Sequence, residues 1–249
     1  MRQHDKIINI AAKKVLAPKG LFRKGSSRIW LDDNGYFIIQ VEFQPSGRSQ
    51  GSYLNVGISF LWEYSKALNE SLAFDYGNRV YVDGKQFVPY SGNDEEFMIE
   101  MEQFAEVALQ KIIEYRQFRD TDYAKKQLVQ QIADTPEERR FWELYNAAMI
   151  CFLKGDFEDG KECFASFINI LKNSFYVNGF YIEWHEEFYN HCIQCIQPYL
   201  DSKENAQKMV LEMIRRRRDF FSSKSSFKKM KKEIEISLTD FDPSNQQNE

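Results

Sequence analysis

Gly20–Trp62 reads GLFRKGSSRIWLDDNGYFIIQVEFQPSGRSQGSYLNVGISFLW, and this stretch decides the fold class. Alternate residues from Phe37 to Phe43 are apolar, and a second alternating run extends from Leu54 to Trp62. Because successive side chains of a strand point to opposite faces, each run predicts a strand with one buried face and one face open to water. The polar Gly/Ser-rich loop between the runs favours adjacent antiparallel strands.

Further strands are predicted on both sides of this pair. Arg28–Leu31 predicts a short strand that leads into a turn at Asp33–Gly35, where Asn and Gly accept positive φ. Arg79–Val82 and Gln86–Tyr90 predict another strand pair, because Asp83-Gly84 between them is a strong hairpin signal. The chain between the second run and this pair is expected to be a short helix or a long connection.

Two amphipathic helices accompany these strands. The first is predicted over Asp5–Ala17, where apolar residues form one stripe before Pro18 ends the helix. The second begins after Asn93 and keeps a helical apolar period as far as Tyr115, with acidic residues in its first turn. The first 118 residues therefore predict an α+β fold, an antiparallel sheet with flanking helices.

The remainder of the chain predicts an all-α helical subdomain. Thr135 followed by Pro136 is typical of a helix start, with Thr135 as the cap. Residues 137–173 then predict helix, tight turn, helix, and this single hairpin resembles part of the tetratricopeptide pattern without a second copy. More helices are expected near Ile182–Leu200 and Lys203–Phe221. The predicted organisation is an α+β domain at 1–118, a helical subdomain at 119–221 and a basic then acidic polar tail at 222–249.

Composition and charge exclude several classes of protein. Of 249 residues, 43% are hydrophobic and 15% aromatic, which excludes a disordered chain. The net charge is −4, but residues 121–202 hold 7 basic and 13 acidic side chains, whereas residues 203–249 hold 11 basic and 8 acidic ones. No apolar run is long enough to span a membrane, and the first residues do not read as a signal peptide. Four cysteines without a disulfide pattern favour a reducing, cytoplasmic setting.

Three motifs of the opening stretch resemble a known family. After a helix come GLFRKGSSRIW from Gly20, a strand ending in VEFQPS at Ser46, and YLNVGISF from Tyr53. Together they resemble the bacterial family called domain of unknown function 4304, over roughly residues 5–118. Leu21 between Gly20 and Phe22 departs from the family pattern. The resemblance implies an α+β fold and a cytoplasmic bacterial setting, and it implies no activity, because the family is itself functionally uncharacterised. Members look like stand-alone accessory proteins, and some are similar to immunity-type proteins of toxin systems.

A polar set beside the two central strands is the first candidate site. Basic and amide side chains at one sheet edge suit an anionic ligand or a protein partner, because Arg offers a bidentate fork. The alternative is a solvated sheet face with turn-forming residues. The candidate ligand or partner-binding residues are Arg23, Lys24, Arg28, Gln44, Ser46, Arg48 and Asn55.

Two other clusters suggest nucleic acid and metal. Four consecutive arginines, Arg215, Arg216, Arg217 and Arg218, precede Phe220 and further lysines, and basic residues beside aromatics suit phosphate contact and base stacking. The alternative is a solvated helix end, which a net charge of −4 favours. Metal-capable side chains also gather in a short run, but their spacing does not place them together on one helix face, so we predict no metal. These are His185, His191, Cys192 and Cys195.

No recognised motif indicates catalysis. The chain has no GxSxG, no P-loop and no dinucleotide-binding GxGxxG, and no catalytic residue or cofactor is predicted. We predict a protein that acts by binding another protein, and the resemblance to domain of unknown function 4304 implies that it is a cytoplasmic bacterial accessory protein with an immunity-like role. The acidic balance of the helical half favours a basic partner. A nucleic-acid-binding or processing factor that uses the C-terminal basic segment is the alternative, and an enzyme without a recognisable motif also stays open.

Overall fold

The computed structural model describes residues 2–63, 69–177 and 179–230, and they divide into two compact units. The described residues within Met1–Leu61, Glu70–Gln117 and Arg218–Ile234 form the first unit. Those within Trp62–Asn69 and Phe118–Arg217 form the second. This division differs from the sequential one that we predict, because residues 218–230 belong to the first unit instead of following the helical subdomain. The rest of the predicted tail, residues 231–249, lies outside the described residues.

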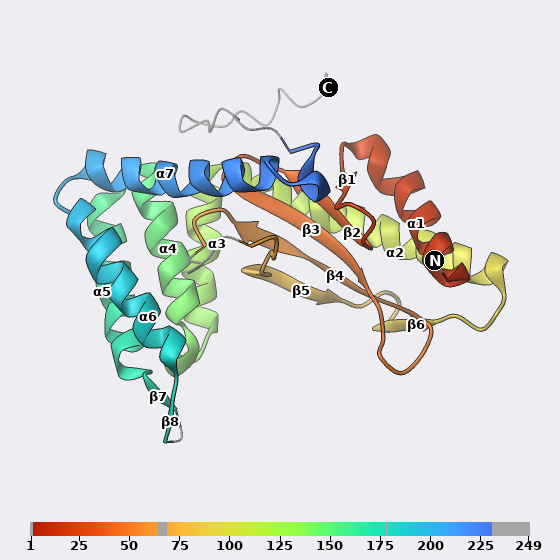
Figure 1. Cartoon of the computed structure of the whole chain (residues 1–249), viewed down its shortest axis with the longest axis horizontal. Coiled ribbons are helices and arrows are strands. Elements are labelled where there is room, and N and C mark those ends of the chain that lie inside the picture. The colour runs from red at the N-terminus through yellow and green to blue at the C-terminus, as the bar shows by residue number, and fades with distance from the viewer. Residues whose placement is uncertain (1, 64–68, 178, 231–249) are drawn as a thin grey trace. The chain divides into compact units, whose positions relative to one another are not determined.

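The first unit contains the antiparallel sheet (Figure 1). Its strands follow the order β1-β2-β3-β4-β5, and β6 also pairs with β4. The β3–β4 ladder is the longest, and it confirms the antiparallel pairing that the two alternating runs predict. Val41 lies opposite Val56 at its centre. The strands are β1 (Phe22–Arg23), β2 (Ile29–Asp33), β3 (Phe37–Gln44), β4 (Gly51–Phe60), β5 (Tyr76–Val80) and β6 (Phe87–Pro89).

The predicted pairing between the last two strands is wrong. Val82 and Lys85 form an isolated bridge around the expected turn, in which Asp83 and Gly84 both have positive φ. However, β5 and β6 do not form a ladder with each other: β5 pairs with β4 over Leu54–Ile58, and β6 pairs with it over Gly51–Tyr53. Since β4 is ten residues long, one of its edges accommodates both short strands in succession.

Helices α1 (Gln3–Leu16) and α2 (Asp94–Tyr115) cover the sheet face that carries Trp30, Val41 and Val56 (Figure 1). Asn93 caps α2, because its side chain accepts a hydrogen bond from Glu96 N at 3.3 Å, as predicted. The buried face of each helix is the apolar stripe seen in the sequence. The α+β class predicted from the sequence is therefore confirmed.

The opposite sheet face is not open to water, in contrast to the prediction. Gln40 and Ser59 point to this face but are buried, and their side chains donate hydrogen bonds to the backbone oxygens of Leu72 and Ala73. The connection before β5 therefore covers part of the face and satisfies its polar groups. Further along the same face, Asp33 of β2 accepts hydrogen bonds from Arg218.

The second unit is helical, and its described residues also include a short β-hairpin with two residues in each strand. At its centre, α4 and α5 form the predicted helical hairpin around Gly155, whose φ is +91°. Gly160 of α5 lies close to α4, because an added Cβ would lie 2.5 Å from the Phe152 ring. The elements are α3 (Thr121–Asp134), α4 (Phe141–Lys154), α5 (Phe157–Asn173), β7 (Tyr176–Val177), β8 (Phe180–Tyr181), α6 (Glu183–His191), a π-helical turn (Cys192–Ile196) and α7 (Lys203–Ser222), which ends in the first unit.

Two sequence expectations about this unit are wrong. Trp62 does not continue β4: it is fully buried in the second unit, where its Nε1 donates to Asn146 Oδ1 at 3.0 Å. Tyr145 OH also donates to Trp62 O at 2.9 Å. Thr135 does not cap a helix start. Its hydroxyl donates instead to Gln131 O at 2.8 Å, at the end of α3.

Short 3₁₀ turns join several of the larger elements in both units. These turns are Ala17–Lys19, Arg116–Arg119, Glu137–Arg139, Gln197–Tyr199 and Ser225–Phe227.

Among the helices of the described residues, none combines the length and the apolar character that crossing a membrane requires.

Candidate functional sites

The predicted polar set divides into separate groups. Arg28 is largely buried and belongs to the scaffold, because its guanidinium donates to Asp5 of α1 and to Gly51 O at 3.1 Å. This contact joins the start of α1 to the start of β4. Burial and the Arg28 hydrogen bond act in opposite directions on the pKa of Asp5, and the net effect lowers it. Arg28 therefore stabilises the fold and does not present a free guanidinium.

Gln44 and Asn55 do lie together, around an arginine that the sequence analysis missed. Asn55 Nδ2 donates to Gln44 Oε1 at 3.1 Å and to Glu42 Oε2 at 2.9 Å. Arg79 of β5 donates from Nε to Asn55 Oδ1 at 3.0 Å and also contacts Gln44. Its guanidinium lies 4.1 Å from the centre of the Tyr53 ring. The group is an internally satisfied network across three strands, and cross-strand pairing with Asn55 is the signal that places Arg79 there.

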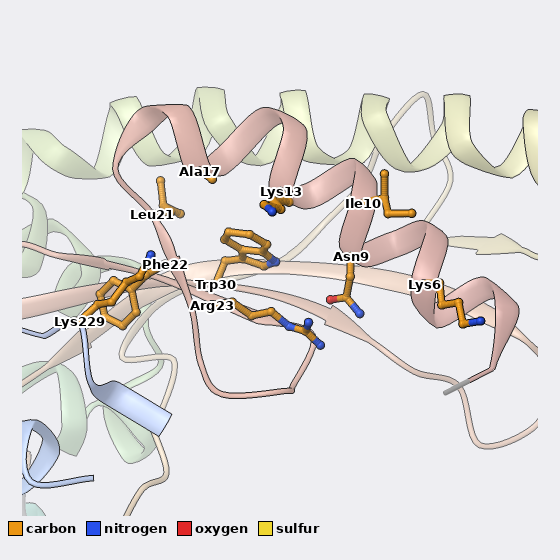
Figure 2. A pocket seen from close by; sticks show the side chains of 10 residues that line it. All are labelled: Lys6, Asn9, Ile10, Lys13, Ala17, Leu21, Phe22, Arg23, Trp30 and Lys229. Carbon is orange, nitrogen blue, oxygen red and sulfur yellow. The ribbon is translucent and has the colours of Figure 1, made fainter. Parts of the chain in front are cut away.

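The side chains of Arg23 and Lys24 both donate hydrogen bonds to backbone oxygens. Arg23 donates to the backbone oxygens of Ser26 and Ser27, closing the turn between β1 and β2. Lys24 contacts Glu70 O and lies 4.9 Å from the centre of the Phe227 ring. Arg23 also lines a groove beside α1, where its side chain runs next to Trp30 (Figure 2).

Ser46 and Arg48 belong to the loop between β3 and β4. Ser46 Oγ accepts hydrogen bonds from the backbone nitrogens of Arg48 at 3.1 Å and of Ser49 at 3.4 Å. The hydroxyl therefore orders the loop, while Arg48 is exposed. The structure brings Gln44 and Asn55 together, but it places the other members of the predicted set in different local contacts.

The four consecutive arginines have unequal environments. Arg215 is exposed and pairs with Glu212 at 2.9 Å, and Arg216 is exposed. Arg217 is 3% exposed and lies 3.7 Å from Glu63 Oε2. Arg218 is 4% exposed and donates to both carboxylate oxygens of Asp33. Half of the predicted cationic run is therefore buried in ion pairs.

The metal-capable residues of α6 and of the π-helical turn after it do not converge. His185 Nδ1 lies 2.7 Å from Ser174 O and 2.8 Å from Ser174 Oγ, so the imidazole fastens the start of α6 to the end of α5. Burial, reinforced by the charge of Arg216, lowers the pKa of His191. Cys192 is buried while Cys195 is exposed. In the part of the chain that the structure describes, no three His, Cys, Asp or Glu side chains are grouped as a metal site.

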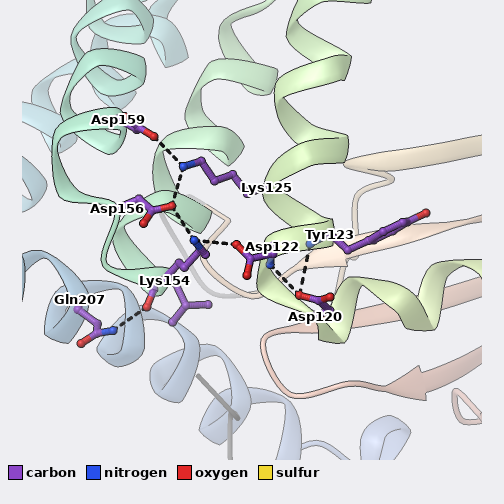
Figure 3. A network of polar contacts seen from close by, with 9 residues as sticks. Asp120, Asp122, Tyr123, Lys125, Lys154, Asp156, Asp159 and Gln207 are labelled. Atoms are coloured by element: carbon purple, nitrogen blue, oxygen red, sulfur yellow. Dashed lines mark hydrogen bonds and ion pairs between the residues drawn. The ribbon is translucent and has the colours of Figure 1, made fainter. Parts of the chain in front are cut away.

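A lysine–aspartate network joins α3, α4 and α5 (Figure 3). Lys125 lies 2.6 Å from both Asp156 and Asp159, and Lys154 lies 2.7 Å from Asp122 and 3.0 Å from Asp156. Burial alone would lower the pKa of Lys125, but the two carboxylates raise it. Because every charge in the network has an opposite partner, it stabilises the helix arrangement instead of activating a nucleophile.

Among the described residues, exposed large apolar side chains gather on the β7–β8 hairpin and at the start of α6. Five large side chains of this region are between 45% and 74% exposed, and the sequence analysis did not single them out. The density of aromatic residues along FYVNGFYIEW, at residues 175–184, is the signal that could have indicated them. We call these five residues the aromatic ledge: Tyr176, Val177, Phe180, Tyr181 and Trp184.

Comparisons of the chain with protein-family models, with curated proteins and with solved structures found no match.

Proposed function

We propose that this protein is a cytoplasmic bacterial accessory protein, immunity-like in character, that acts by binding another protein through the aromatic ledge. The single observation that carries the proposal is the exposure of the ledge itself. Large exposed apolar side chains close together are typical of a protein interaction surface. In the ledge, Tyr176 and Tyr181 share one face of the hairpin, and Val177 and Phe180 share the other. The resemblance to domain of unknown function 4304 supports the accessory role and the bacterial setting.

The ledge is held in place by specific contacts. Tyr176 and Tyr181 are cross-strand partners with ring centres 5.4 Å apart. Trp184 stacks on Trp142 at 6.2 Å with an angle of 10° between the rings. Ile182 N donates to Phe175 O at 2.8 Å, which closes the hairpin at its base. A surface that is ordered before binding loses less conformational entropy when a partner arrives.

The charge beside the ledge favours a basic partner. Glu183 and Glu186 lie in the first turn of α6, and the Tyr181 hydroxyl donates to Glu186. Aromatic faces attract Arg and Lys, and neighbouring carboxylates strengthen that attraction. Tyr, Trp and Arg are also the residues that contribute most to binding energy in protein interfaces. The proposed partner therefore presents arginine or lysine side chains around an apolar centre.

Site-specific photocross-linking tests this function. A photoreactive phenylalanine analogue replaces Phe180, which is 74% exposed, and in a matched control replaces Ile99 of α2, which is 62% exposed. In bacterial cells we expect a discrete cross-linked protein from position 180 and none from position 99. The partner, identified by mass spectrometry and purified, is then expected to bind the unmodified protein with an affinity that falls as salt increases.

Single substitutions provide a second test of the role of the ledge. Phe180→Asp is expected to weaken binding of the purified partner at least about tenfold, which corresponds to 1.4 kcal/mol, whereas Ile99→Asp leaves it unchanged. Equal cross-linking from positions 180 and 99, or equal affinities of the two variants, would contradict a role for the ledge.

The nucleic-acid alternative rests on the exposed half of the arginine run. Arg216 is exposed, and Arg215 is exposed but shares its charge with Glu212. This is a smaller cationic surface than four arginines in sequence indicate, and phosphate binding depends on the number of cations that reach the backbone. A mobility shift with single-stranded RNA at low salt that is lost in Arg216→Glu would favour this alternative over the ledge.

A further inference from the structure

We propose that the groove between α1 and the β1–β2 edge of the sheet binds an amphipathic carboxylate, meaning a carboxylate head on an unbranched apolar chain. The groove has a volume of about 520 Å³, within the usual range of small-molecule sites. It belongs entirely to the first unit and is separate from the aromatic ledge. Its lining residues are Lys6, Asn9, Ile10, Lys13, Ala17, Leu21, Phe22, Arg23, Trp30 and Lys229.

One stripe of α1 forms a wall of the groove. Lys6, Ile10, Lys13 and Ala17 recur at intervals of four, three and four residues, so they share one helix face. Ile10 is 55% exposed on this stripe, although the neighbouring stripe of α1 is buried against the sheet and α2. Leu21 and Phe22 supply further apolar surface, and they stand near the same groove in Figure 2. This wall suits a hydrocarbon chain.

The charge of the lining has one sign. Lys6, Lys13, Arg23 and Lys229 are cationic, and none of the described residues that line the groove is acidic. Lys14, the next residue of α1, does not line the groove and pairs instead with Glu102 at 2.8 Å. Uncompensated cations above an apolar wall favour an occupant that brings its own negative charge.

A buried donor lies at the base of the groove. Trp30 is 4% exposed, and its indole Nε1 has no hydrogen-bond partner among the described residues. In Figure 2 this nitrogen faces the side of the groove where Asn9, Lys13 and Arg23 are drawn. Buried N–H groups are usually paired, because an unpaired one loses its hydrogen bond to water without replacement. A carboxylate oxygen offers the missing acceptor and is also neutralised by Lys13 and Arg23.

The polar and the apolar lining residues of the groove would contact different parts of the ligand. The carboxylate head contacts Trp30 Nε1 and the cations beside it, and the chain extends over Ile10 toward Leu21 and Phe22. A neutral alcohol of the same length satisfies the indole donor but not the cations. A short carboxylate satisfies both polar features but covers little of the apolar wall. The site therefore discriminates on charge and on chain length together.

Nuclear magnetic resonance of the indole groups tests the proposal on the full chain. The four tryptophans give four indole N–H signals, and Trp30→Phe identifies one of them. Decanoate, titrated below its micellar concentration, is expected to move the Trp30 signal and to leave those of Trp62, Trp142 and Trp184 in place. Decan-1-ol and butyrate are expected to bind at least about tenfold more weakly, a difference of 1.4 kcal/mol.

Charge reversal supplies the matched control. Lys13→Glu is expected to weaken decanoate binding at least about tenfold, while Lys126→Glu, an equal charge change on an exposed side chain of the second unit, leaves it unchanged. The proposal is overturned if the Trp30 signal does not move, if decan-1-ol binds as well as decanoate, or if both lysine variants behave alike. Sedimentation with phosphatidylglycerol vesicles in place of decanoate binding would also overturn it, since it would indicate a membrane surface.

Discussion

Arg218 donates two parallel hydrogen bonds to Asp33, from Nη1 to Oδ1 and from Nη2 to Oδ2, each 2.8 Å long. The two residues are 185 positions apart in the chain, and both are largely buried. Arg218 Nη1 also donates to Gly35 O at 2.7 Å, which fixes the turn between β2 and β3. A planar guanidinium matches a carboxylate in this bidentate geometry, and a lysine does not.

Removing this guanidinium is expected to destabilise the protein strongly. Arg218→Leu leaves the Asp33 carboxylate buried without its partner, at a cost of about 3–5 kcal/mol. Arg218→Lys keeps the charge but loses the fork, so its loss is expected to be smaller yet measurable by urea unfolding. Arg215→Ala on the same helix is the control, because its ion pair with Glu212 is exposed. Equal free energies of unfolding for Arg218→Leu and Arg215→Ala would contradict a stabilising role for the buried Arg218–Asp33 ion pair.

Acid is expected to weaken the network around Asp156. Although burial raises the pKa of Asp156, hydrogen bonds from Lys125 and Lys154 lower it below the usual 3.8. A carboxylate with a lowered pKa in the folded state contributes its full stabilisation above pH 3.8 and loses it as the pH falls through the lowered value. Asp156→Asn should therefore have a lower Tm than the unsubstituted protein at pH 7. The difference in Tm between the two proteins should become smaller below pH 3.8.

Thermal unfolding followed by circular dichroism between pH 7 and pH 2.5 measures this difference. The exposed Asp134 supplies the control, since Asp134→Asn removes a carboxylate from α3 outside the network. A difference in Tm for Asp156→Asn that stays constant across this range would show that its ionisation does not stabilise the fold.

Gly57 is expected to tolerate no side chain. A Cβ there would lie 2.5 Å from Tyr76 O and 2.6 Å from Phe74 Cδ1, because β5 and the segment before it pack directly on β4. Gly57→Ala should cost about 1–3 kcal/mol in the free energy of unfolding. At Gly47 the same added Cβ meets no atom within 4 Å, so Gly47→Ala should change stability by no more than about 1 kcal/mol. Similar values for both variants would argue against the close approach of β5.

The four cysteines are expected to react with Ellman's reagent in a fixed order. Cys195 is exposed and should react first in the native protein, and Cys195→Ser should remove this fast phase. Burial raises the pKa of Cys151 to about 12 and also raises that of Cys192, so neither forms the reactive thiolate near neutral pH. Cys163 is partly exposed with a raised pKa and should react slowly. Rapid reaction of more than two thiols without denaturant would contradict this burial.

The structural features that depend on local sequence patterns could be predicted. The period-two alternation of β3 and β4 and the Asn93 cap of α2 are each readable within a few residues, and the structure confirms them. The pairing of β5 and β6 was not predictable in this way, because it depends on how much of the β4 edge each strand occupies.

The candidate site was harder to predict, because contacts distant in sequence decide which charges remain exposed. Nothing near Arg218 in the sequence indicates that Asp33 buries it, and nothing near Asn55 points to Arg79 except strand pairing. The groove combines residues from α1, β1, β2 and Lys229, and only Arg23 among them was in the predicted set. The aromatic ledge is local in sequence, and the density of aromatic residues along this run was available as a signal.

The discontinuity of the first unit has a consequence for synthesis. The ribosome delivers β2 early, but Arg218 emerges 185 residues after Asp33, a delay of roughly 10–40 s at usual elongation rates. During this time the Asp33 carboxylate has no guanidinium to pair with. The amino-terminal unit is therefore the first to begin folding and the last to finish, and a chain interrupted during translation between β6 and Arg218 has all six strands of the sheet but lacks the guanidinium that pairs with Asp33.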